Sequence, residues 1–194
     1  ITYYKEEQSS SVQSITGNEL NEVYADPVQP VIWIATQRAG LNAYNYETQS
    51  FSVYQFNPED PQSLITNDVT HINSSVQAGK GLWVCTYYRS TVPALPSEQT
   101  WTATEAEDGK LYIGHVEGGL SILSLNDKSV KHFVHDPQNP NSLPGNDVRC
   151  IYKDTNGNIW IGTSKGLALF NANTDTFTNF HNNPGNIHGA LSSY

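Results

Sequence analysis

Basic residues are scarce in this 194-residue sequence, which has 10 Lys and Arg against 19 Asp and Glu and a net charge of −9. Charged residues of both signs make up only 15% of the chain, and no run of Lys or Arg occurs. Proteins bind nucleic acid largely by neutralising phosphates with basic side chains. The composition therefore argues against nucleic acid as a partner, and against anionic membrane surfaces for the same reason.

Long apolar stretches and methionine are missing as well. A membrane-spanning helix needs about 20 consecutive apolar residues, and no segment approaches that length, so we expect no direct membrane insertion of this segment. Residues 1–6 do not resemble a signal peptide. Because a complete gene product begins with Met, we expect the chain to be processed or to be a piece of a longer protein.

Cysteine is rare, with Cys85 and Cys150 as its two occurrences. They fall in different copies of the repeat described below, with another copy between them. We interpret them as two buried thiols rather than a disulfide. The two cysteines therefore do not indicate in which cellular compartment the protein lies.

One short pattern is present four times, and each copy holds a branched residue, an aromatic residue and another branched residue. The copies are Ile32–Thr36, Leu82–Thr86, Leu111–His115 and Ile159–Thr163. Aromatic residues at 11%, with 14 Gly and 10 Pro, suit many short strands joined by turns. The sequence predicts an all-β repeat protein.

The fourth copy is the most complete and sets the pattern for the others. Four strands are expected, over 148–153, 159–163, 166–170 and 177–180, and the first two are joined by a turn with the Asn-Gly signal of a tight reversal. In the first strand, Val148, Cys150 and Tyr152 alternate with the residues between them. Aligned on this copy, the repeats cover approximately 18–56, 67–98, 99–135 and 146–181.

The second repeat is shorter than the others. Trp83 and Tyr112 are 29 positions apart, against 50 from Trp33 to Trp83 and 48 from Tyr112 to Trp160. Residues 87–99 include two prolines and cannot hold two ordinary strands with their turns. We expect a stunted sheet here.

Repeats of about 40–50 residues with four short strands are typical of β-propeller blades. We predict one β-propeller segment over 1–194, built of about four four-stranded antiparallel blades with the second shortened, as a fragment of a longer propeller. A blade cannot bury both faces of its sheet alone, so the recurring Trp residues are expected to pack against neighbouring blades.

The fourth repeat also resembles a known family. The pattern runs from Asn146-Asp147-Val148 through Asp154, Gly157, Ile159-Trp160-Ile161-Gly162-Thr163 and Gly166-Leu167 to Phe170, Phe177 and Phe180. It resembles the two-component regulator propeller repeat. That resemblance implies the periplasmic sensor region of a Bacteroides-type hybrid two-component system anchored in the inner membrane, with histidine kinase activity elsewhere in the parent protein.

A ligand site is expected at the loops between second and third strands, because strand parity sends these loops and the linkers between blades to one end of the propeller. The candidate residues are Gln37, Arg38, Tyr87, Tyr88, Arg89, His115 and Lys165. Aromatic ring faces and side chains that form two hydrogen bonds at once suit a sugar ligand. A uronic or sulfated sugar would also pair with the basic groups. Solvated loop tips are the alternative interpretation.

Catalytic, metal and cofactor sites find little support in the sequence. The acidic run Glu105–Asp108 is expected to be a solvated turn on the opposite face from the basic residues. The turn Asp154–Asn158 resembles the start of a calcium loop but lacks the downstream Glu, and the histidines show no zinc spacing. We predict no catalytic residue, metal or cofactor in this segment.

Three functions remain open from the sequence. The first is a sensor segment that detects oligosaccharides in the periplasm, or supports their detection, and so controls transcription of genes for glycan use. The others are a propeller enzyme acting on polysaccharide, as a lyase or glycosidase, and a protein-interaction propeller without a small ligand. Expected partners are an oligosaccharide, the remaining blades and domains of the parent protein, and a second copy bound through uncovered blade faces.

Overall fold

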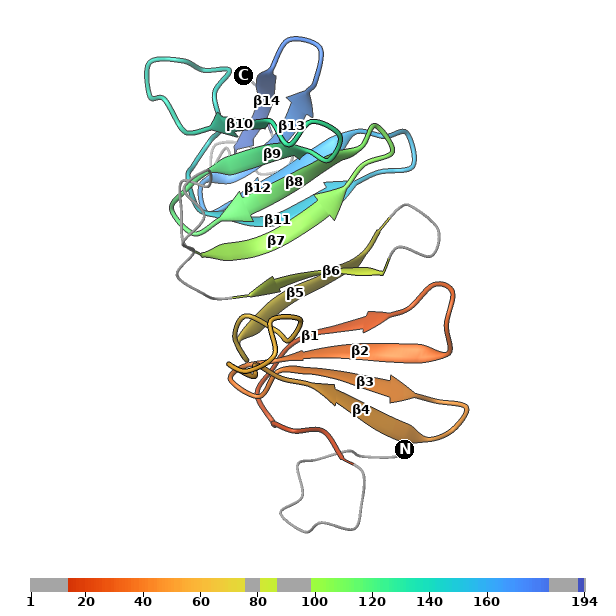
Figure 1. The fold of residues 1–194 in the computed structure, drawn as a ribbon. Coiled ribbons are helices and arrows are strands. Elements are labelled where there is room, and N and C mark those ends of the chain that lie inside the picture. The colour runs from red at the N-terminus through yellow and green to blue at the C-terminus, as the bar shows by residue number, and fades with distance from the viewer. Residues whose placement is uncertain (1–13, 76–80, 87–98, 182–191, 194) are drawn as a thin grey trace. The chain divides into compact units, whose positions relative to one another are not determined.

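A computed structural model describes residues 14–75, 81–86, 99–181 and the backbone of 192–193. The chain divides into two compact units, Ile1–Arg89 and Ser90–Tyr194, which we describe separately. Every regular element in the described residues is a strand (Figure 1). Within those residues there is no helix of the length and apolarity needed to cross a membrane.

The first unit contains a four-stranded antiparallel sheet, blade 1, in the order β1-β2-β3-β4. Its strands are β1 (Leu20–Ala25), β2 (Val31–Thr36), β3 (Leu41–Asn45) and β4 (Ser50–Tyr54). The described strands of the next sheet, blade 2, are β5 (Val69–Ser74) and β6 (Leu82–Thr86), which pair with each other. The predicted remainder of the second repeat, after Thr86, falls outside the described residues.

The second unit contains two complete blades. Blade 3 is formed by β7 (Thr100–Glu105), β8 (Lys110–His115), β9 (Leu120–Ser124) and β10 (Val130–Phe133). Blade 4 is formed by β11 (Val148–Lys153), β12 (Ile159–Thr163), β13 (Gly166–Asn171) and β14 (Thr176–His181). A two-residue strand, β15 (Ser192–Ser193), pairs antiparallel with the outer edge of β14.

An aspartate at the first turn of blades 1 and 4 closes the hairpin and fixes the tryptophan of the second strand. In blade 4, Asp154 Oδ1 accepts hydrogen bonds from the amides of Asn156 and Asn158, while Oδ2 accepts one from Trp160 Nε1 at 3.0 Å. In blade 1, Asp26 bonds Trp33 Nε1 in the same way at 3.1 Å. The recurring Trp is therefore held by a local hydrogen bond as well as by packing.

A β-bulge recurs at the start of every inner strand. The register shifts between Leu20 and Glu22, between Val69 and His71, between Thr100 and Thr102, and between Val148 and Cys150. A bulge inserts one extra residue and reverses which face the later side chains occupy. Val148 and Ile151, three residues apart, are consequently both buried.

The bulge corrects our prediction of two buried thiols. Cys85 in β6 is buried as expected, whereas Cys150 in β11 is exposed, and each remains a thiol. A regular strand would place Cys150 on the same face as the buried Val148, but the shifted register moves it and Tyr152 outward. The prediction for Cys150 was wrong because a single-sequence alternation pattern does not reveal a bulge.

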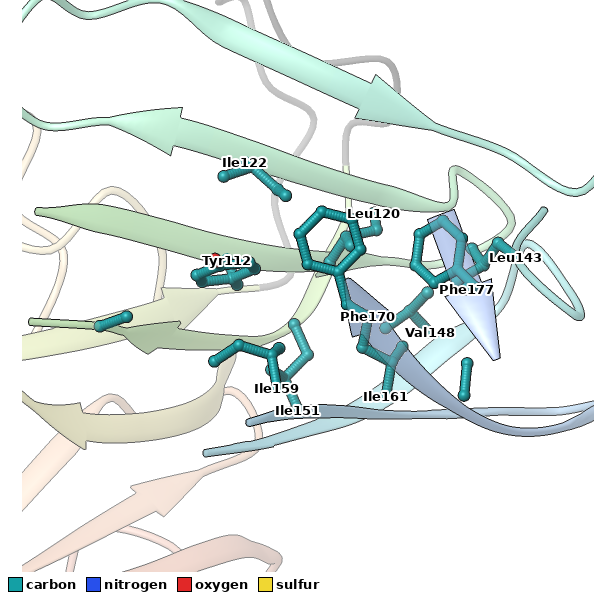
Figure 2. Close-up of a cluster of buried hydrophobic side chains, with 12 residues drawn as sticks. Tyr112, Leu120, Ile122, Leu143, Val148, Ile151, Ile159, Ile161, Phe170 and Phe177 are labelled. Atoms are coloured by element: carbon teal, nitrogen blue, oxygen red, sulfur yellow. The ribbon is translucent and has the colours of Figure 1, made fainter. Parts of the chain in front are cut away.

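The core of the second unit lies between blades 3 and 4 and is shown in Figure 2. Phe170 is its central ring, and its centroid lies 6.0 Å from that of Tyr112, 5.4 Å from that of Phe133 and 5.2 Å from that of Phe177. Apolar residues from both sheets and from the preceding linker complete the cluster, among them Leu120, Leu143, Val148 and Ile161. Burial of Tyr112 raises the pKa of its phenol to about 12.

Hydrogen bonds from the inner strands join neighbouring blades within each unit. In the first unit, Asn21 Nδ2 donates to the Val69 carbonyl at 2.7 Å, and the Ile72 amide donates to Glu22 Oε2 at 2.5 Å. In the second unit, Thr104 Oγ1 donates to the Ile151 carbonyl at 3.1 Å. Adjacent inner strands are thus linked by polar contacts even though they belong to different sheets.

Substituting Gly119 with Ala should destabilise the chain strongly. Gly119 has φ +77°, and a β-carbon there would overlap the Phe133 carbonyl oxygen. Gly157, with φ +83° and no atom within 4 Å of an added β-carbon, provides the matched control. We expect Gly157→Ala to cost about 1–2 kcal/mol and Gly119→Ala a further 1–3 kcal/mol or so. Urea denaturation measures both, and equal losses would contradict this interpretation of Gly119.

Candidate functional site: the mouth loops

The segments between the second and third strands of a blade, here called the mouth loops, cover 37–40 in blade 1, 116–119 in blade 3 and 164–165 in blade 4. In blades 1 and 3, the loop lies next to the residues that precede the inner strand of the following blade. Gly40 donates its amide hydrogen to the Asn67 carbonyl at 2.8 Å, and Gly119 donates equivalently to Asn146 at 2.7 Å. The loop backbones are therefore held in place, and their side chains project from a fixed frame.

Gln37 and Arg38 form the tip of the blade 1 mouth loop. The Gln37 amide donates to the Glu19 carbonyl, and the Arg38 amide donates to Asp68 Oδ1, both at 2.8 Å. Arg38 adopts φ 64°, a left-handed conformation that the loop needs at this position. The side chains of Gln37 and Arg38 are exposed and make no hydrogen bond within the described chain. A carboxamide and a guanidinium are therefore free to bind a ligand in this unit.

Lys165 occupies the mouth loop of blade 4. Its amide donates to Thr163 Oγ1 at 3.1 Å, and its carbonyl oxygen lies 3.2 Å from His181 Nδ1. The ammonium group is exposed and has no ion pair in the described chain. The structure thus leaves this charge available to an anionic group.

Two residues that the sequence did not point to lie at the same end of the second unit. Trp101 and Arg149 are the bulged residues of β7 and β11. Asp147 connects them, because it accepts a hydrogen bond from Trp101 Nε1 at 3.2 Å and one from Arg149 Nε at 2.9 Å. A bulge redirects its side chain, and Trp101 and Arg149 hold the same position of their repeats, because they are separated by the same 48 positions as Tyr112 and Trp160.

His115 was expected to line the ligand site at a mouth loop, but it lies at the end of a strand. It is the last residue of β8, its side chain has no exposed surface, and its Nε2 lies 2.8 Å from Ser121 Oγ. Ser121 Oγ lies 3.2 Å from His132 Nδ1, which extends the chain of polar contacts. Burial, with a smaller contribution from His132, lowers the pKa of His115 to about 4. His115 is therefore a neutral interior residue, and it reaches no solvent-facing ligand in this conformation.

The candidate residues do not form one observed cluster. Gln37 and Arg38 lie together in the first unit, and Lys165 lies in the second with Trp101 and Arg149 at the same strand ends. Tyr87, Tyr88 and Arg89 lie outside the described residues. A binding site that combines all of them stays a prediction.

The three acidic residues at and just after the end of β7 have different surroundings. Glu105 is buried, Glu107 pairs with Lys153, and Asp108 pairs with Lys110 at 2.6 Å. The Lys153 hydrogen bond lowers the pKa of Glu107. Glu107 and Asp108 are thus engaged by different lysines, and the run offers no matched acid and base.

The turn that resembles a calcium loop uses its aspartate internally. Asp154 accepts hydrogen bonds from Asn158 and Trp160, and these, with two backbone amides, lower its pKa to about 2. Within the described residues, no group of three or more His, Cys, Asp or Glu is arranged to hold a metal ion. The turn is explained by the hairpin that it closes.

Part of blade 4 matches a known family of repeats, and most of the chain resembles a solved extracellular domain. The family model described as two component regulator propeller matches residues 142–165, which include β11, β12 and the blade 4 mouth loop. The extracellular domain of the putative hybrid two-component system BT3049 from B. thetaiotaomicron is 85% identical, with a TM-score of 0.83, over 92% of this chain and 25% of that chain. This likeness confirms the all-β propeller fold.

More distant proteins extend the comparison. A protein named histidine kinase P4, from Formosa agariphila, is 32% identical in an alignment 172 residues long that covers 81% of this chain and 12% of that protein. The extracellular domain of the putative one-component system BT4673 from B. thetaiotaomicron, at 17% identity and a TM-score of 0.69, supports the fold alone.

The chain therefore spans about a quarter of the solved BT3049 domain and about an eighth of the kinase. It corresponds to a propeller segment of these longer proteins. Residues 142–165 thus carry a two-component regulator propeller repeat, and the chain around them is similar to the extracellular domain of a hybrid two-component system.

Proposed function

We propose that this chain is a sensor segment of a hybrid two-component system, which detects oligosaccharides in the periplasm or supports the domain that detects them. One observation carries the proposal, namely the 85% identity to the extracellular domain of such a system over 92% of the chain. Signalling from the segment would reach a histidine kinase in the parent protein and control transcription of genes for glycan use. The remaining blades and domains of that protein are its proposed partners, and a second copy is a further partner through uncovered blade faces.

The mouth loops are the proposed ligand contacts. Arg38 and Lys165 carry positive charges that have no partner in the described chain, and Trp101, which is 40% exposed, adds an aromatic ring beside the Asp147–Arg149 ion pair. Guanidinium groups bind carboxylates and sulfates through paired hydrogen bonds, and an indole face packs against a sugar ring. These residues favour an acidic oligosaccharide, either uronic or sulfated, and Gln37, Tyr87, Tyr88 and Arg89 are proposed to contribute further polar and aromatic contacts.

The test is calorimetric titration of the chain with oligogalacturonate and with sulfated oligosaccharides. We expect Arg38→Ala and Lys165→Ala each to weaken binding about tenfold, because a hydrogen bond to a charged group contributes about 1.5–3 kcal/mol. Lys131→Ala is the matched control, since Lys131 is exposed and paired with Asp175 at 2.6 Å. It should bind like the original chain.

Two results would contradict the proposal. The first is equal weakening by Lys131→Ala, which would indicate a general charge effect. The second is the absence of binding to any acidic oligosaccharide, which would contradict the mouth loops as ligand contacts. Turnover of a bound glycan would instead favour an enzyme.

A further inference from the structure

A cleft in the first unit lies apart from the mouth-loop side chains. It has a volume of about 720 Å³ and extends along one face of blade 1 to strand β6 of blade 2. Trp33 and Tyr54 from blade 1 and Leu82 and Val84 from β6 supply its apolar lining. This volume is within the range of small-molecule sites, which are about 300–1,000 Å³.

The second unit shows why this face is open. Tyr54 pairs with Leu41 at the end of β4, as Phe133 pairs with Leu120 at the end of β10, so Tyr54 and Phe133 are equivalent. Phe133 is covered by two rings of the next blade, Phe170 at 5.4 Å and Phe177 at 5.6 Å between centroids. Those rings belong to the third and fourth strands of blade 4.

Blade 2 has no described counterpart of those two strands. Its described strands end at Thr86, and the shortened spacing of 29 residues between Trp83 and Tyr112 removes about 20 residues of the repeat. Tyr54 is accordingly 47% exposed, whereas Phe133 is packed into its core cluster. Among the described residues, Tyr54 thus lacks the two ring contacts from a following blade that cover Phe133.

The aromatic side chains are held so that their rings remain accessible. Trp33 Nε1 donates to Asp26 Oδ2 at 3.1 Å, which fixes the indole by its edge. The Tyr54 ring lies 5.8 Å from it between centroids, at an angle of 40°. Both rings line the cleft, so a ligand with a flat apolar face can pack against them.

Polar groups of the cleft define the rest of the ligand. The side-chain amides of Gln29 and Gln62 line it and make no hydrogen bond within the described chain, so each offers a donor and an acceptor. Asp26 and Asp60 also line the cleft. Partial burial acts to raise the pKa of Asp26, but hydrogen bonds from Gln29, Trp33 and Val28 together lower it, so it stays ionised. Two carboxylates disfavour an anionic ligand.

We infer that this cleft binds a neutral pyranose unit of a glycan, with the sugar ring against Trp33 and Tyr54 and its hydroxyls bonded to Gln29 and Gln62. A pyranose combines an apolar face of C–H groups with hydroxyls around its edge, which matches the two kinds of surface present. The inference is independent of the proposed mouth site, because it involves other residues. The mouth site is proposed to bind acidic sugars, whereas the cleft is proposed to bind a neutral one.

The experiment titrates the chain with the neutral probes maltotetraose, cellotetraose, xylotetraose and mannotetraose, followed by calorimetry and by tryptophan fluorescence. At least one probe should bind. Tyr54→Ala and Gln62→Ala, both at exposed positions, should weaken that binding at least tenfold and about threefold respectively. Trp33→Phe, which keeps an aromatic ring, should weaken it less than Trp33→Ala. Circular dichroism verifies that each variant is folded.

The matched control is Tyr152→Ala, which removes a tyrosine that is 64% exposed in the second unit and should leave affinity unchanged. Lys165→Ala and Arg38→Ala should also leave neutral-sugar binding unchanged, which separates this cleft from the mouth site. The inference is overturned if none of the four probes binds. It is equally overturned if binding persists in Tyr54→Ala and Gln62→Ala, or if only the mouth-loop variants weaken it.

Discussion

Replacing Phe170 with Ala is expected to lower the free energy of unfolding of the chain by about 3–5 kcal/mol, the range found for removal of a buried phenyl group. Phe170 is 7% exposed and contacts rings from β8, β10 and β14. These strands hold their rings from three directions, so the space cannot close without moving backbone. Urea denaturation followed by far-ultraviolet circular dichroism measures the loss.

Phe56→Ala is the control for this substitution, because Phe56 is 48% exposed in the linker after blade 1. We expect it to cost less than about 0.5 kcal/mol, as is usual for surface positions. Similar losses for the two variants would mean that the cluster around Phe170 does not hold blades 3 and 4 together.

Acidification from pH 7 to pH 4 is expected to cost the chain about 3 kcal/mol of stability through His115. Burial lowers its pKa from 6.5 to about 4 in the folded state. Between these values the unfolded state binds a proton that the folded state does not. The contribution is therefore fully present above about pH 6.5 and is lost as the pH falls toward 4.

His115→Thr should flatten this pH dependence, since Thr36 and Thr163 occupy the corresponding last position of β2 and β12. Ser121→Ala is the control, because it removes the 2.8 Å contact with His115 but leaves the imidazole buried. We expect the slope to persist in that variant. A slope unchanged in His115→Thr would contradict the assignment.

Two aspartates, Asp154 and Asp127, contribute to the pH dependence of stability at lower pH than His115 does. Asp154 and Asp127 have pKa values lowered from 3.8 to about 2 by hydrogen bonds to their carboxylates. Their stabilisation is present above 3.8 and is lost only as the pH falls further. Measurements between pH 7 and pH 4 therefore report on His115 with little contribution from these two groups.

The strands were predictable because each blade repeats the same local signals. The Asn-Gly turn and the branched-aromatic-branched pattern predicted Ile159–Thr163, which is β12 residue for residue. Alignment of the repeats then transferred those boundaries to blades 1 and 3 with shifts of about one residue. Local turn chemistry and strand pattern agree in this chain, and such agreement is what makes a fold readable from sequence.

The candidate site was less predictable, for reasons that individual residues show. A bulge at Arg149 turns Cys150 outward, and nothing in the alternation of one strand reveals it. His115 aligns at a strand end with Thr36, which is fully buried, and with Thr163, which is half-buried, so the repeat alone did not fix its burial. The contacts of Asp147 depend on three-dimensional neighbours 46 positions away in sequence, such as Trp101.

The polar links between inner strands have a consequence for how such a chain changes during evolution. Asn21 and Glu22 hold β5 to blade 1 through the Val69 carbonyl and the Ile72 amide, so this attachment uses nothing from the outer half of blade 2. A recombination event that deletes outer strands from blade 2 would therefore leave these two links to blade 1 in place. Propellers built in this way can lose half a blade without losing the order of the others, and each such loss exposes a new surface on which selection can act.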